Sequence, residues 1–581
     1  MPDRHPTRIG RVTRVDSGTV VATVDPAVSG VAPIYRGQMQ SIGQVGSLIR
    51  IPQGSIDLLG SVTGVELITD RTESVATERQ LLLLNLIGEV DRSTRRFRRG
   101  VAALPGLGDP VHFATPTDLA VVFPAEGASH VRLGAVGSAE AVPACIDAQR
   151  LVLRHSAIVG STGSGKSSAV ATLLQGLARR GWQNANIVVV DPHGEYANAL
   201  GDSAKVLSVL QQAGEAQLQV PYWALSAQDL WRALTGSALS GESFNRWIEL
   251  ITEARQKFAA GCAWIEQAPP TITADTPIPF NINGVWFQMD SENRATGDSK
   301  SDPSQWRIDR EGNPETLTST QFVPYGPTGG EPNKFSTYGR YMTVPDKLRH
   351  GLRDPQRQFL LSATIGPGEA DPLPEIVAGW IGGQSPISVL DFSGVPGEVT
   401  EIAVGAILDL ILQVAVNTPD EGPGVGRTHP VLVVLEEAHR YIGKGGSLAA
   451  KSADRIAREG RKHGVGLMMV TQRPSELPAT ALAQCGTIIA LRLTNAEDQQ
   501  RVQASLPDSL QGIGSALGSL RTGEAIVSGE ALTIPTRVVV DRPSPFPRAE
   551  DPSLDSWHNS PSKPDLTNAI AQWRSIYGGT S

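Results

Sequence analysis

Short runs of alternating apolar and polar residues, separated by Gly, Asp and Pro, fill the first part of the chain. Such runs occupy residues 11–15, 19–24, 47–51 and 58–63. A period of two is typical of strands that bury one face, and short strands at this spacing predict a small β-barrel. We therefore expect an N-terminal β-barrel over residues 1–140.

Later runs are apolar throughout and are bounded by polar turns, as in the buried strands of a parallel sheet. They occupy residues 157–159, 187–190, 388–392, 430–435, 467–472 and 487–493, with further edge strands at 524–527 and 533–540. Helical patterns follow several of these runs. The sequence therefore predicts an α/β core in two parts, residues 141–225 and 386–541.

The two core parts are separated by residues 226–385, which form a predicted insertion. Residues 243–260 have helical periodicity, and a polar, Gly/Pro-rich tract with several aromatic side chains follows over 269–345. We expect a mainly helical accessory region, which either contacts nucleic acid or a partner, or packs as a bundle with a partly mobile loop. Residues 542–581 are expected to be a C-terminal arm that reaches a neighbouring subunit or is disordered.

A phosphate-binding loop lies between an apolar run and a helical run. It fits G-x-x-x-x-G-K-[ST] in full and comprises Gly160, Ser161, Thr162, Gly163, Ser164, Gly165, Lys166, Ser167 and Ser168. Backbone N–H groups of such a turn, together with the positive end of the helix dipole, cradle the phosphates of ATP. Lys166 is expected to reach the β- and γ-phosphates, and the Ser167 hydroxyl to ligate Mg²⁺.

Carboxylates follow two of the apolar runs. Asp191 ends the run at 187–190, and the pair Glu436 and Glu437 follows the run at 430–435. Because the carboxyl ends of parallel strands share one ligand-binding edge, we expect these side chains near the phosphates. We assign Asp191 and Glu436 to the Mg²⁺ shell and Glu437 to the base that polarises the attacking water. For the pair, an ordinary helix N-terminus that favours carboxylates is the alternative.

Polar and basic residues elsewhere complete the candidate site. Gln472, at the end of a predicted strand, is placed to sense the γ-phosphate or to orient water. Arg458 and Arg461 lie on a predicted basic helix, and Arg154 lies just before the phosphate loop. Such an arginine can serve a neighbouring subunit's nucleotide as a finger, and a solvated helix face is the alternative for each one.

Composition and charge indicate the number of domains, the cellular compartment and the kind of ligand that the chain can bind. The 581 residues, 40% of them hydrophobic, suffice for several domains, and no signal peptide or uninterrupted membrane-spanning run is evident. Three scattered cysteines fit a reducing compartment, so we expect a cytoplasmic protein without a membrane partner. The net charge of −8 argues against a chain coated with nucleic acid, although a ring can hide a basic pore.

A basic cluster interrupts this acidic chain between residues 92 and 99, where five arginines occur. Nucleic acid is one candidate ligand. A solvated hairpin or a subunit-contact loop is the favoured alternative, because only one aromatic residue is interleaved.

The ordered set of motifs resembles the HerA branch of the HerA/FtsK ATPases. The set comprises the phosphate loop, VDPHGEY at 190–196, LEEAHR at 435–440, REGRKHGVG at 458–466 and TQRP at 471–474. The resemblance covers about residues 145–540. It implies an α/β RecA-like P-loop ATPase core with an N-terminal small β-barrel and a mainly helical insertion.

The same resemblance implies a homohexameric ring with ATP and Mg²⁺ between subunits, a channel able to admit duplex DNA, and an effector docked through the barrel. Carried onto this sequence, Lys166 and Ser167 bind phosphate and Mg²⁺, Glu436 and Glu437 form the acidic pair, and Gln472 is the sensor. Arg461 is the first candidate for the trans-acting arginine, with Arg154 and Arg458 behind it.

Two functions are compatible with these features. The favoured one is a ring ATPase that assembles with and regulates an effector, a nuclease or a sirtuin-like NAD-hydrolysing enzyme, in an anti-phage defence complex. The alternative is a DNA translocase motor that works with a nuclease in DNA-end processing. The acidic net charge and the absence of an obvious basic track in the predicted insertion favour the first.

Overall fold

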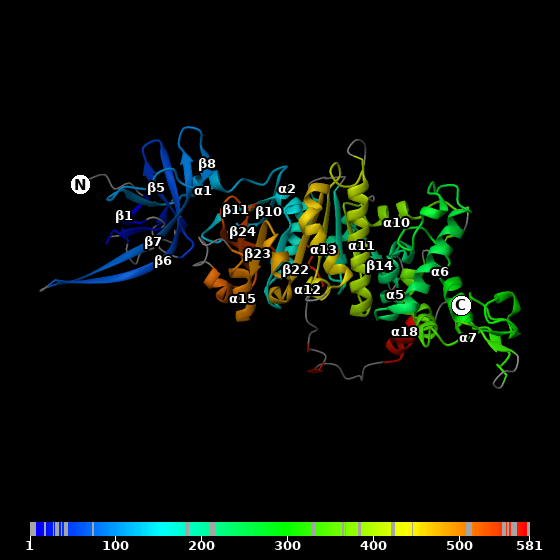
Figure 1. The fold of residues 1–581 in the computed structure, drawn as a ribbon. Coiled ribbons are helices and arrows are strands. Elements are labelled where there is room, and N and C mark those ends of the chain that lie inside the picture. Colours follow the sequence, from blue (N-terminus) through cyan, green and yellow to red (C-terminus); the bar gives the residue numbers. More distant parts are fainter. Residues whose placement is uncertain are drawn as a thin grey trace.

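The computed structural model consists of a β-barrel, a central sheet flanked by helices, and a helical region, which follow one another along an elongated molecule (Figure 1). It describes residues 7–16, 19–26, 28, 34–35, 38–39, 45–72, 75–179, 185–209, 216–326, 332–362, 365–366, 368–381, 385–419, 424–443, 446–506, 514–548, 554, 557–558 and 566–577. The predicted succession of barrel, α/β core and helical insertion is confirmed.

The barrel closes in the strand order β2-β1-β9-β5-β6-β7, with β7 pairing back onto β2 in the described part of the chain. The bounds are β1 Arg8–Val15, β2 Val20–Val24, β5 Leu48–Gln53, β6 Ile56–Thr72, β7 Val75–Asp91 and β9 Pro110–Phe113. Inward side chains such as Ile9, Ile51 and Leu84 form its core. A separate short ladder joins β3 (Ile34–Tyr35) to β4 (Gln38–Met39).

The arginine cluster forms an exposed hairpin on the barrel, in line with the favoured alternative. It spans the turn after β7 and strand β8 (Arg96–Arg99), which pairs with β7. Arg92 is anchored by an ion pair of 2.6 Å to Asp57.

The boundary at residue 140 was placed too late. Strands β10 (His130–Val136) and β11 (Ala139–Asp147) form a hairpin that belongs to the central sheet, because β10 pairs with β25 (Thr536–Val540). The barrel ends with β9 and the short helix α1 (Pro116–Val122). The strands β10 and β11 alternate apolar and polar residues as the barrel strands do, so this pattern alone does not separate them from the barrel.

The central sheet has the order β11-β10-β25-β24-β23-β12-β22-β21-β13-β20-β14-β15 among the described residues. Its other bounds are β12 Ser156–Val159, β13 Asn186–Asp191, β14 Ala204–Ser208, β15 Ala216–Gln217, β20 Ile387–Asp391, β21 Val431–Leu435, β22 Val465–Thr471, β23 Thr487–Leu491 and β24 Glu524–Gly529. The strands from β23 to β15 are parallel. The strand that leads into the phosphate loop, β12, therefore lies inside the sheet.

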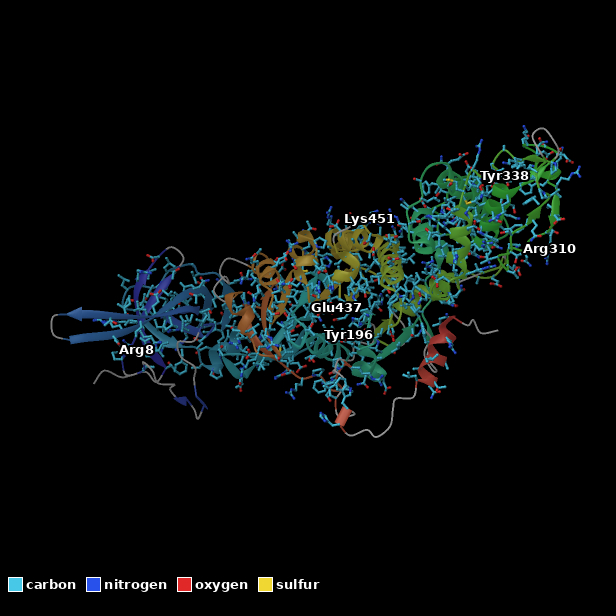
Figure 2. The ribbon with its side chains drawn as sticks, turned by 90° about the horizontal axis from the view of Figure 1, so that it is seen from below. Arg8, Tyr196, Arg310, Tyr338, Glu437 and Lys451 are labelled. Atoms are coloured by element: carbon cyan, nitrogen blue, oxygen red, sulfur yellow. The ribbon has the colours of Figure 1, made fainter. Side chains whose placement is uncertain are left out.

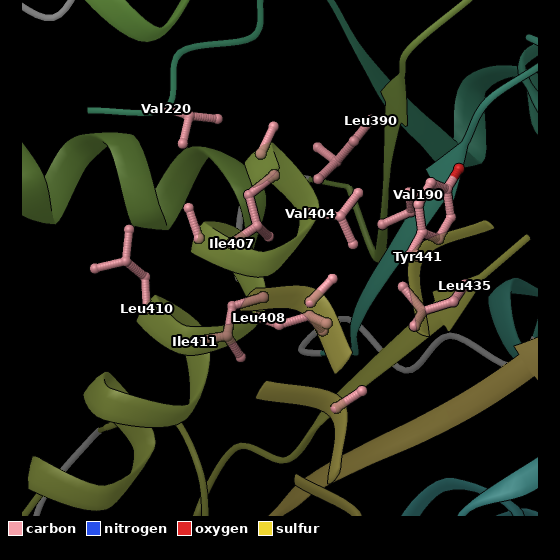
Figure 3. Close-up of a cluster of buried hydrophobic side chains, with 14 of the residues drawn as sticks. Val190, Val220, Leu390, Val404, Ile407, Leu408, Leu410, Ile411, Leu435 and Tyr441 are labelled. Carbon is pink, nitrogen blue, oxygen red and sulfur yellow. The ribbon is translucent and has the colours of Figure 1, made fainter. Parts of the chain in front are cut away.

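Helices cover both faces of this sheet. One face carries α2 (Ala148–Leu153), α3 (Lys166–Ala178) and α4 (Tyr196–Leu200), and the other carries α11 (Gly397–Asn417), α12 (His439–Ile442) and α13 (Leu448–Glu459). In Figure 3, Val404 of α11 points toward the strand residues Leu390 and Val190, which belong to the same buried cluster. The helices α14 (Ala479–Ala483) and α15 (Ala496–Gln503) follow β22 and β23.

Helix α11 is long and apolar enough to cross a membrane by length and composition, with a mean hydropathy of 2.0 in its most apolar window. However, 67% of that window is buried inside the protein. A search for uninterrupted apolar runs misses it because Glu398, Glu401 and Asp409 interrupt the helix. Burial in the core accounts for its hydrophobicity.

The inserted region is a packed bundle whose apolar core is continuous with that of the sheet. Its helices are α5 Ala227–Thr235, α6 Gly241–Ala259, α7 Ile282–Arg294, α8 Val344–Arg353, α9 Gln358–Leu361 and α10 Leu373–Trp380. Buried tryptophans hold them together, and Trp231 and Trp247 meet edge to face at 5.4 Å between ring centroids. The polar tract adds two short ladders, β16 (Thr296–Gly297) with β19 (Asn333–Lys334) and β17 (Ile308–Arg310) with β18 (Gln321–Phe322).

The C-terminal arm contains a helix, α18 (Thr567–Tyr577). It contacts the 3-10 turn Pro355–Arg357 of the inserted region of the same chain.

We expect Gly466→Ala to destabilise the core. A Cβ at Gly466 in β22 would lie 1.6 Å from the carbonyl oxygen of Val152, so α2 and the sheet would have to separate. We expect a loss of about 3 kcal/mol, read as a lower midpoint of thermal unfolding. The control is Gly379→Ala in α10, where the new Cβ has open space and a better helix former replaces glycine. Equal midpoints for the two variants would contradict the packing described for Gly466.

Candidate functional site

The phosphate loop is tied to the ends of the two strands beside β12. The Gly160 amide donates to the Thr471 carbonyl at 3.2 Å, and the Ser161 amide donates to the Arg492 carbonyl at 2.8 Å. Gly163 and Gly165 have φ of 71° and 99°, a region in which a side chain is disfavoured. A Cβ at Gly160 would lie 2.5 Å from Ser164 Oγ. The loop therefore requires glycine at these positions.

Helix α3 begins at Lys166 and presents free backbone N–H groups to this loop. Its N-cap residue, Gly165, supplies no side-chain cap. The Ser164 hydroxyl is buried and has no hydrogen-bond partner among the described residues. A glycine-rich turn with uncapped helix amides and a lysine suits a polyphosphate, so the residues present fit ATP with Mg²⁺.

The predicted acidic pair lies directly beside the phosphate loop. The Nζ of Lys166 is 3.5 Å from Glu436 Oε1 and 3.5 Å from Glu437 Oε1. Lys166, Glu436 and Glu437 are 9%, 2% and 6% exposed, so a buried cation is held between two buried carboxylates. The structure thus brings together side chains that are 270 positions apart in the sequence (436 − 166).

The two carboxylates differ in their tendency to hold a proton. Burial raises the pKa of Glu436 to about 7, although Lys166 and the Tyr196 hydroxyl act to lower it. Burial also acts to raise the pKa of Glu437, but His439 and Lys166 outweigh it, and the net shift is downward. Glu437 is therefore ionised at neutral pH, as a base for water requires.

Glu437 adopts a strained backbone conformation. Its φ is +50°, an uncommon value for a residue with a side chain. His439 Nδ1 lies 3.2 Å from Glu437 Oε2 and 3.0 Å from Thr471 Oγ1. These contacts fix the side chain of Glu437 next to the end of β22.

The Asp191 carboxylate is occupied by backbone amides of the loop that follows β13, so the structure does not support its assignment to the metal shell. Its carboxylate accepts hydrogen bonds from the amides of His193, Gly194 and Tyr196 at 3.1, 2.9 and 3.0 Å. The side chain is fully buried within its own loop. Its position at the carboxyl end of β13 was predicted correctly, but its oxygens hold the turn that follows the strand.

Gln472 contacts the phosphate loop, as expected of a sensor. Thr162 Oγ1 donates to Gln472 Oε1 at 2.7 Å. Thr494, which follows β23, also contacts the loop through Ser161, with 3.1 Å between the two hydroxyl oxygens. The ends of β22 and β23 therefore both line the loop.

The sequence matches two consecutive parts of one protein family. Residues 131–411 match the central domain of helicase HerA, and residues 383–543 match the HerA-like C-terminal domain. Together the matches span the phosphate loop, the acidic pair and Gln472. The chain belongs to the HerA family. It is an ATP-hydrolysing P-loop NTPase.

Relatives of similar length support this assignment. A probable helicase of Methanocaldococcus jannaschii is 26% identical over 538 residues, covering 91% of this chain and 89% of the relative. The DNA double-strand break repair helicase HerA of Sulfolobus acidocaldarius is 25% identical over 474 residues, covering 81% and 80%. The protein of the same name from Pyrococcus furiosus is 25% identical over 480 residues, covering 74% and 72%.

Solved structures that are similar to this chain include VirB4 and TrwB. VirB4 of Thermoanaerobacter pseudethanolicus has a TM-score of 0.44 at 14% identity, covering 72% of this chain and 97% of VirB4. The plasmid coupling protein TrwB in complex with ADP and Mg²⁺ has a TM-score of 0.42 at 14% identity, covering 73% and 91%.

The candidate arginines of this HerA-family chain lie at the amino ends of the parallel strands, and the phosphate loop lies at their carboxyl ends. Arg154 precedes β12, and Arg461 lies in the 3-10 turn Gly460–His463 that precedes β22. These two strands run parallel, so both arginines lie at the amino ends. Arg154 pairs with Glu530 at 2.9 Å and Arg458 pairs with Asp454 at 2.9 Å. Arg461 is exposed and has no carboxylate partner among the described residues.

The sequence analysis did not identify two side chains that contact the acidic pair, Tyr196 and His439. Both belong to quoted motifs, but neither residue type by itself indicates contact with a carboxylate across the sheet. For His439 the spacing to Glu437, two positions, was a usable signal. For Tyr196 the contact depends on the adjacency of β13 and β21, which only the fold defines.

His155, beside this basic edge, should make stability depend on pH. It is buried and accepts a hydrogen bond from the Leu467 amide at 3.1 Å. Burial, with a smaller effect of Arg461, lowers its pKa from 6.5 to about 4. Since the folded state favours neutral His155, its contribution is complete above pH 6.5 and is lost as the pH falls toward 4.

The expected loss over that window is about 3 kcal/mol, measured by urea unfolding at several pH values. His155→Asn keeps an acceptor and tolerates the φ of +50° at this position, so its stability should fall less steeply. Identical pH profiles for the two proteins would contradict this role of His155.

Proposed function

We propose that this chain is the subunit of a hexameric ring motor that hydrolyses ATP between subunits and moves duplex DNA through a central channel. Its cellular setting would be DNA-end processing in the cytoplasm, with a nuclease as partner. The observation that carries the proposal is that Lys166 and the acidic pair lie together at the carboxyl ends of the parallel strands, whereas exposed Arg461 lies at their amino ends. Relatives named as DNA double-strand break repair helicases support DNA as the substrate.

The phosphate edge of one subunit contains the binding and hydrolytic groups. The loop amides and Lys166 would hold the phosphates, and Ser167 and Glu436 would hold Mg²⁺, which neutralises phosphate charge when bound. Glu437, ionised and fixed by His439, would accept the proton of the attacking water. Gln472 would orient that water from the end of β22.

The opposite edge would serve the next subunit. A head-to-tail ring places the amino edge of one sheet against the phosphate edge of its neighbour. Exposed Arg461, which has no carboxylate partner in the described part of the chain, would then contact the neighbour's γ-phosphate. Arg154 and Arg458 already pair with carboxylates and are weaker candidates.

The comparisons support the DNA motor better than the regulation of a defence effector. The acidic net charge favoured the latter, but net charge averages over the whole surface and does not describe a channel.

We assign partner docking to the barrel, because the barrel lies at the far end of the molecule from the inserted bundle (Figure 1).

Two substitutions test the site. Lys166→Ala should abolish nucleotide binding and turnover, because the phosphates lose their buried cation. Glu437→Gln should lower turnover by about 10²–10⁴-fold while nucleotide still binds, because only the base is lost. Steady-state hydrolysis and equilibrium binding of a fluorescent nucleotide separate these outcomes.

Lys451→Ala on the exposed side of α13 and Glu249→Gln on α6 are matched controls and should keep wild-type turnover. Normal hydrolysis by Glu437→Gln would exclude Glu437 as the base.

The substrate is tested by ATP hydrolysis with and without linear duplex DNA, at low and moderate salt. A motor should be stimulated by DNA, and the stimulation should fall steeply with salt, because phosphate contacts release counterions. Hydrolysis that is indifferent to DNA at both salt concentrations would refute the motor and favour a regulatory ring.

A further inference from the structure

A buried tyrosine contacts the acidic pair from the neighbouring strand. The Tyr196 hydroxyl donates a hydrogen bond of 2.7 Å to Glu436 Oε2. The other oxygen of Glu436, Oε1, is the one that lies 3.5 Å from Lys166 Nζ. Figure 2 shows Tyr196 and Glu437 close together in the central part of the molecule. The two oxygens of Glu436 therefore have separate partners.

The first residue of α4, Tyr196, is held rigidly by the loop before it. The Asp191 carboxylate accepts hydrogen bonds from three amides of that loop, including the amide of Tyr196 at 3.0 Å. Gly194 has φ of +68°, which suits this tight turn. Asp191 thus acts on the site indirectly, by fixing the residue that contacts Glu436.

Helix α4 is also fixed from outside. Gln175 of α3 donates to the Ala199 carbonyl at 2.8 Å, which joins α4 to the helix that carries Lys166. Asn198 donates to the Phe546 carbonyl at 2.9 Å, and the Arg548 amide donates to the Glu195 carbonyl at 3.0 Å. These bonds hold Tyr196 in place relative to the phosphate loop.

The chemistry of Tyr196 suits an orienting role. Its side chain is completely buried, and its hydroxyl is placed to donate to Glu436 Oε2. Without it, Glu436 Oε2 would be a buried acceptor without this partner, which is unfavourable. A freed Glu436 carboxylate could rotate and offer both oxygens to Lys166.

We propose that Tyr196 is a positioning residue that holds Glu436 so that only Oε1 faces Lys166 and the Mg²⁺ position. The proposal rests on the proposed function, in which Glu436 belongs to the metal shell. Tyr196 itself touches neither nucleotide nor water in this assignment. Its effect should therefore appear in the dependence on Mg²⁺ and in kcat, and not in the affinity for metal-free nucleotide.

The test is Tyr196→Phe, which keeps the ring and removes the hydroxyl. We expect the Mg²⁺ concentration for half-maximal hydrolysis to rise about 10–100-fold, the range found when groups supporting a metal ligand are removed. We expect a lower kcat at a KM for ATP within about twofold of wild type. Binding of fluorescent ADP should be unchanged in EDTA and should lose much of its tightening by Mg²⁺, which is a readout independent of turnover.

Two other tyrosines provide matched controls. Tyr222 is equally buried and donates to the Phe280 carbonyl in the inserted bundle. Tyr441 is buried on α12, and its hydroxyl has no hydrogen-bond partner among the described residues. Tyr222→Phe and Tyr441→Phe should keep the wild-type Mg²⁺ dependence. A wild-type Mg²⁺ dependence of Tyr196→Phe itself would overturn the proposal.

A double mutant separates positioning from general loss of structure. If Tyr196 acts through Glu436, Tyr196→Phe combined with Glu436→Gln should be no worse in kcat than Glu436→Gln alone. Additive losses in the double mutant would refute the coupling. Failure of the ATP site as a whole is recognised separately, because Lys166→Ala would then retain turnover.

Discussion

A buried ammonium group, that of Lys166, is the constraint on which the centre of this molecule depends. A charge removed from water is costly unless it is paired, and Lys166 is 9% exposed. The two carboxylates at 3.5 Å compensate it. This pairing requires the loop after β12 to meet the end of β21, and the sheet provides it by placing only β22 between these strands. When phosphates occupy the loop, they can share this role with the carboxylates, which couples nucleotide binding to the acidic pair.

Because the central strands are parallel, their carboxyl ends and their amino ends carry different side chains. The carboxyl ends carry the phosphate loop, the acidic pair and Gln472. The amino ends carry Arg154, His155 and Arg461. Because Arg154 and Arg461 lie at the amino ends of these strands, they are separated from the phosphate loop of their own chain, and in the proposed ring they would face the nucleotide of a neighbouring subunit. The barrel and the inserted bundle lie at opposite ends of the core (Figure 1).

Local sequence determined much of this architecture in advance. The phosphate loop, the buried strands and the acidic pair each depend on residues adjacent in the chain, so their patterns were sufficient. The boundary at residue 140 failed because β10 and β11 alternate like barrel strands, and only their pairing with β25 assigns them to the core. The short strands of the polar tract were missed because ladders of two or three residues carry no periodicity. Asp191 was placed at the correct edge, but strand position does not reveal that neighbouring amides already occupy its oxygens.

Adjacent identical side chains acquire different roles here because different elements contact them. Glu436 continues the buried strand and meets Tyr196 from α4, and its pKa rises because burial dominates. Glu437 turns out of the strand with φ of +50° and meets His439, and its pKa falls because the contact with His439 and the charge of Lys166 outweigh burial. The two carboxylates therefore have different contacts, and in the proposed function they have different tasks, with Glu436 holding a cation and Glu437 accepting a proton. The Glu-Glu sequence permits this division, but the elements packed around it, α4 on one side of the sheet and α12 on the other, produce it.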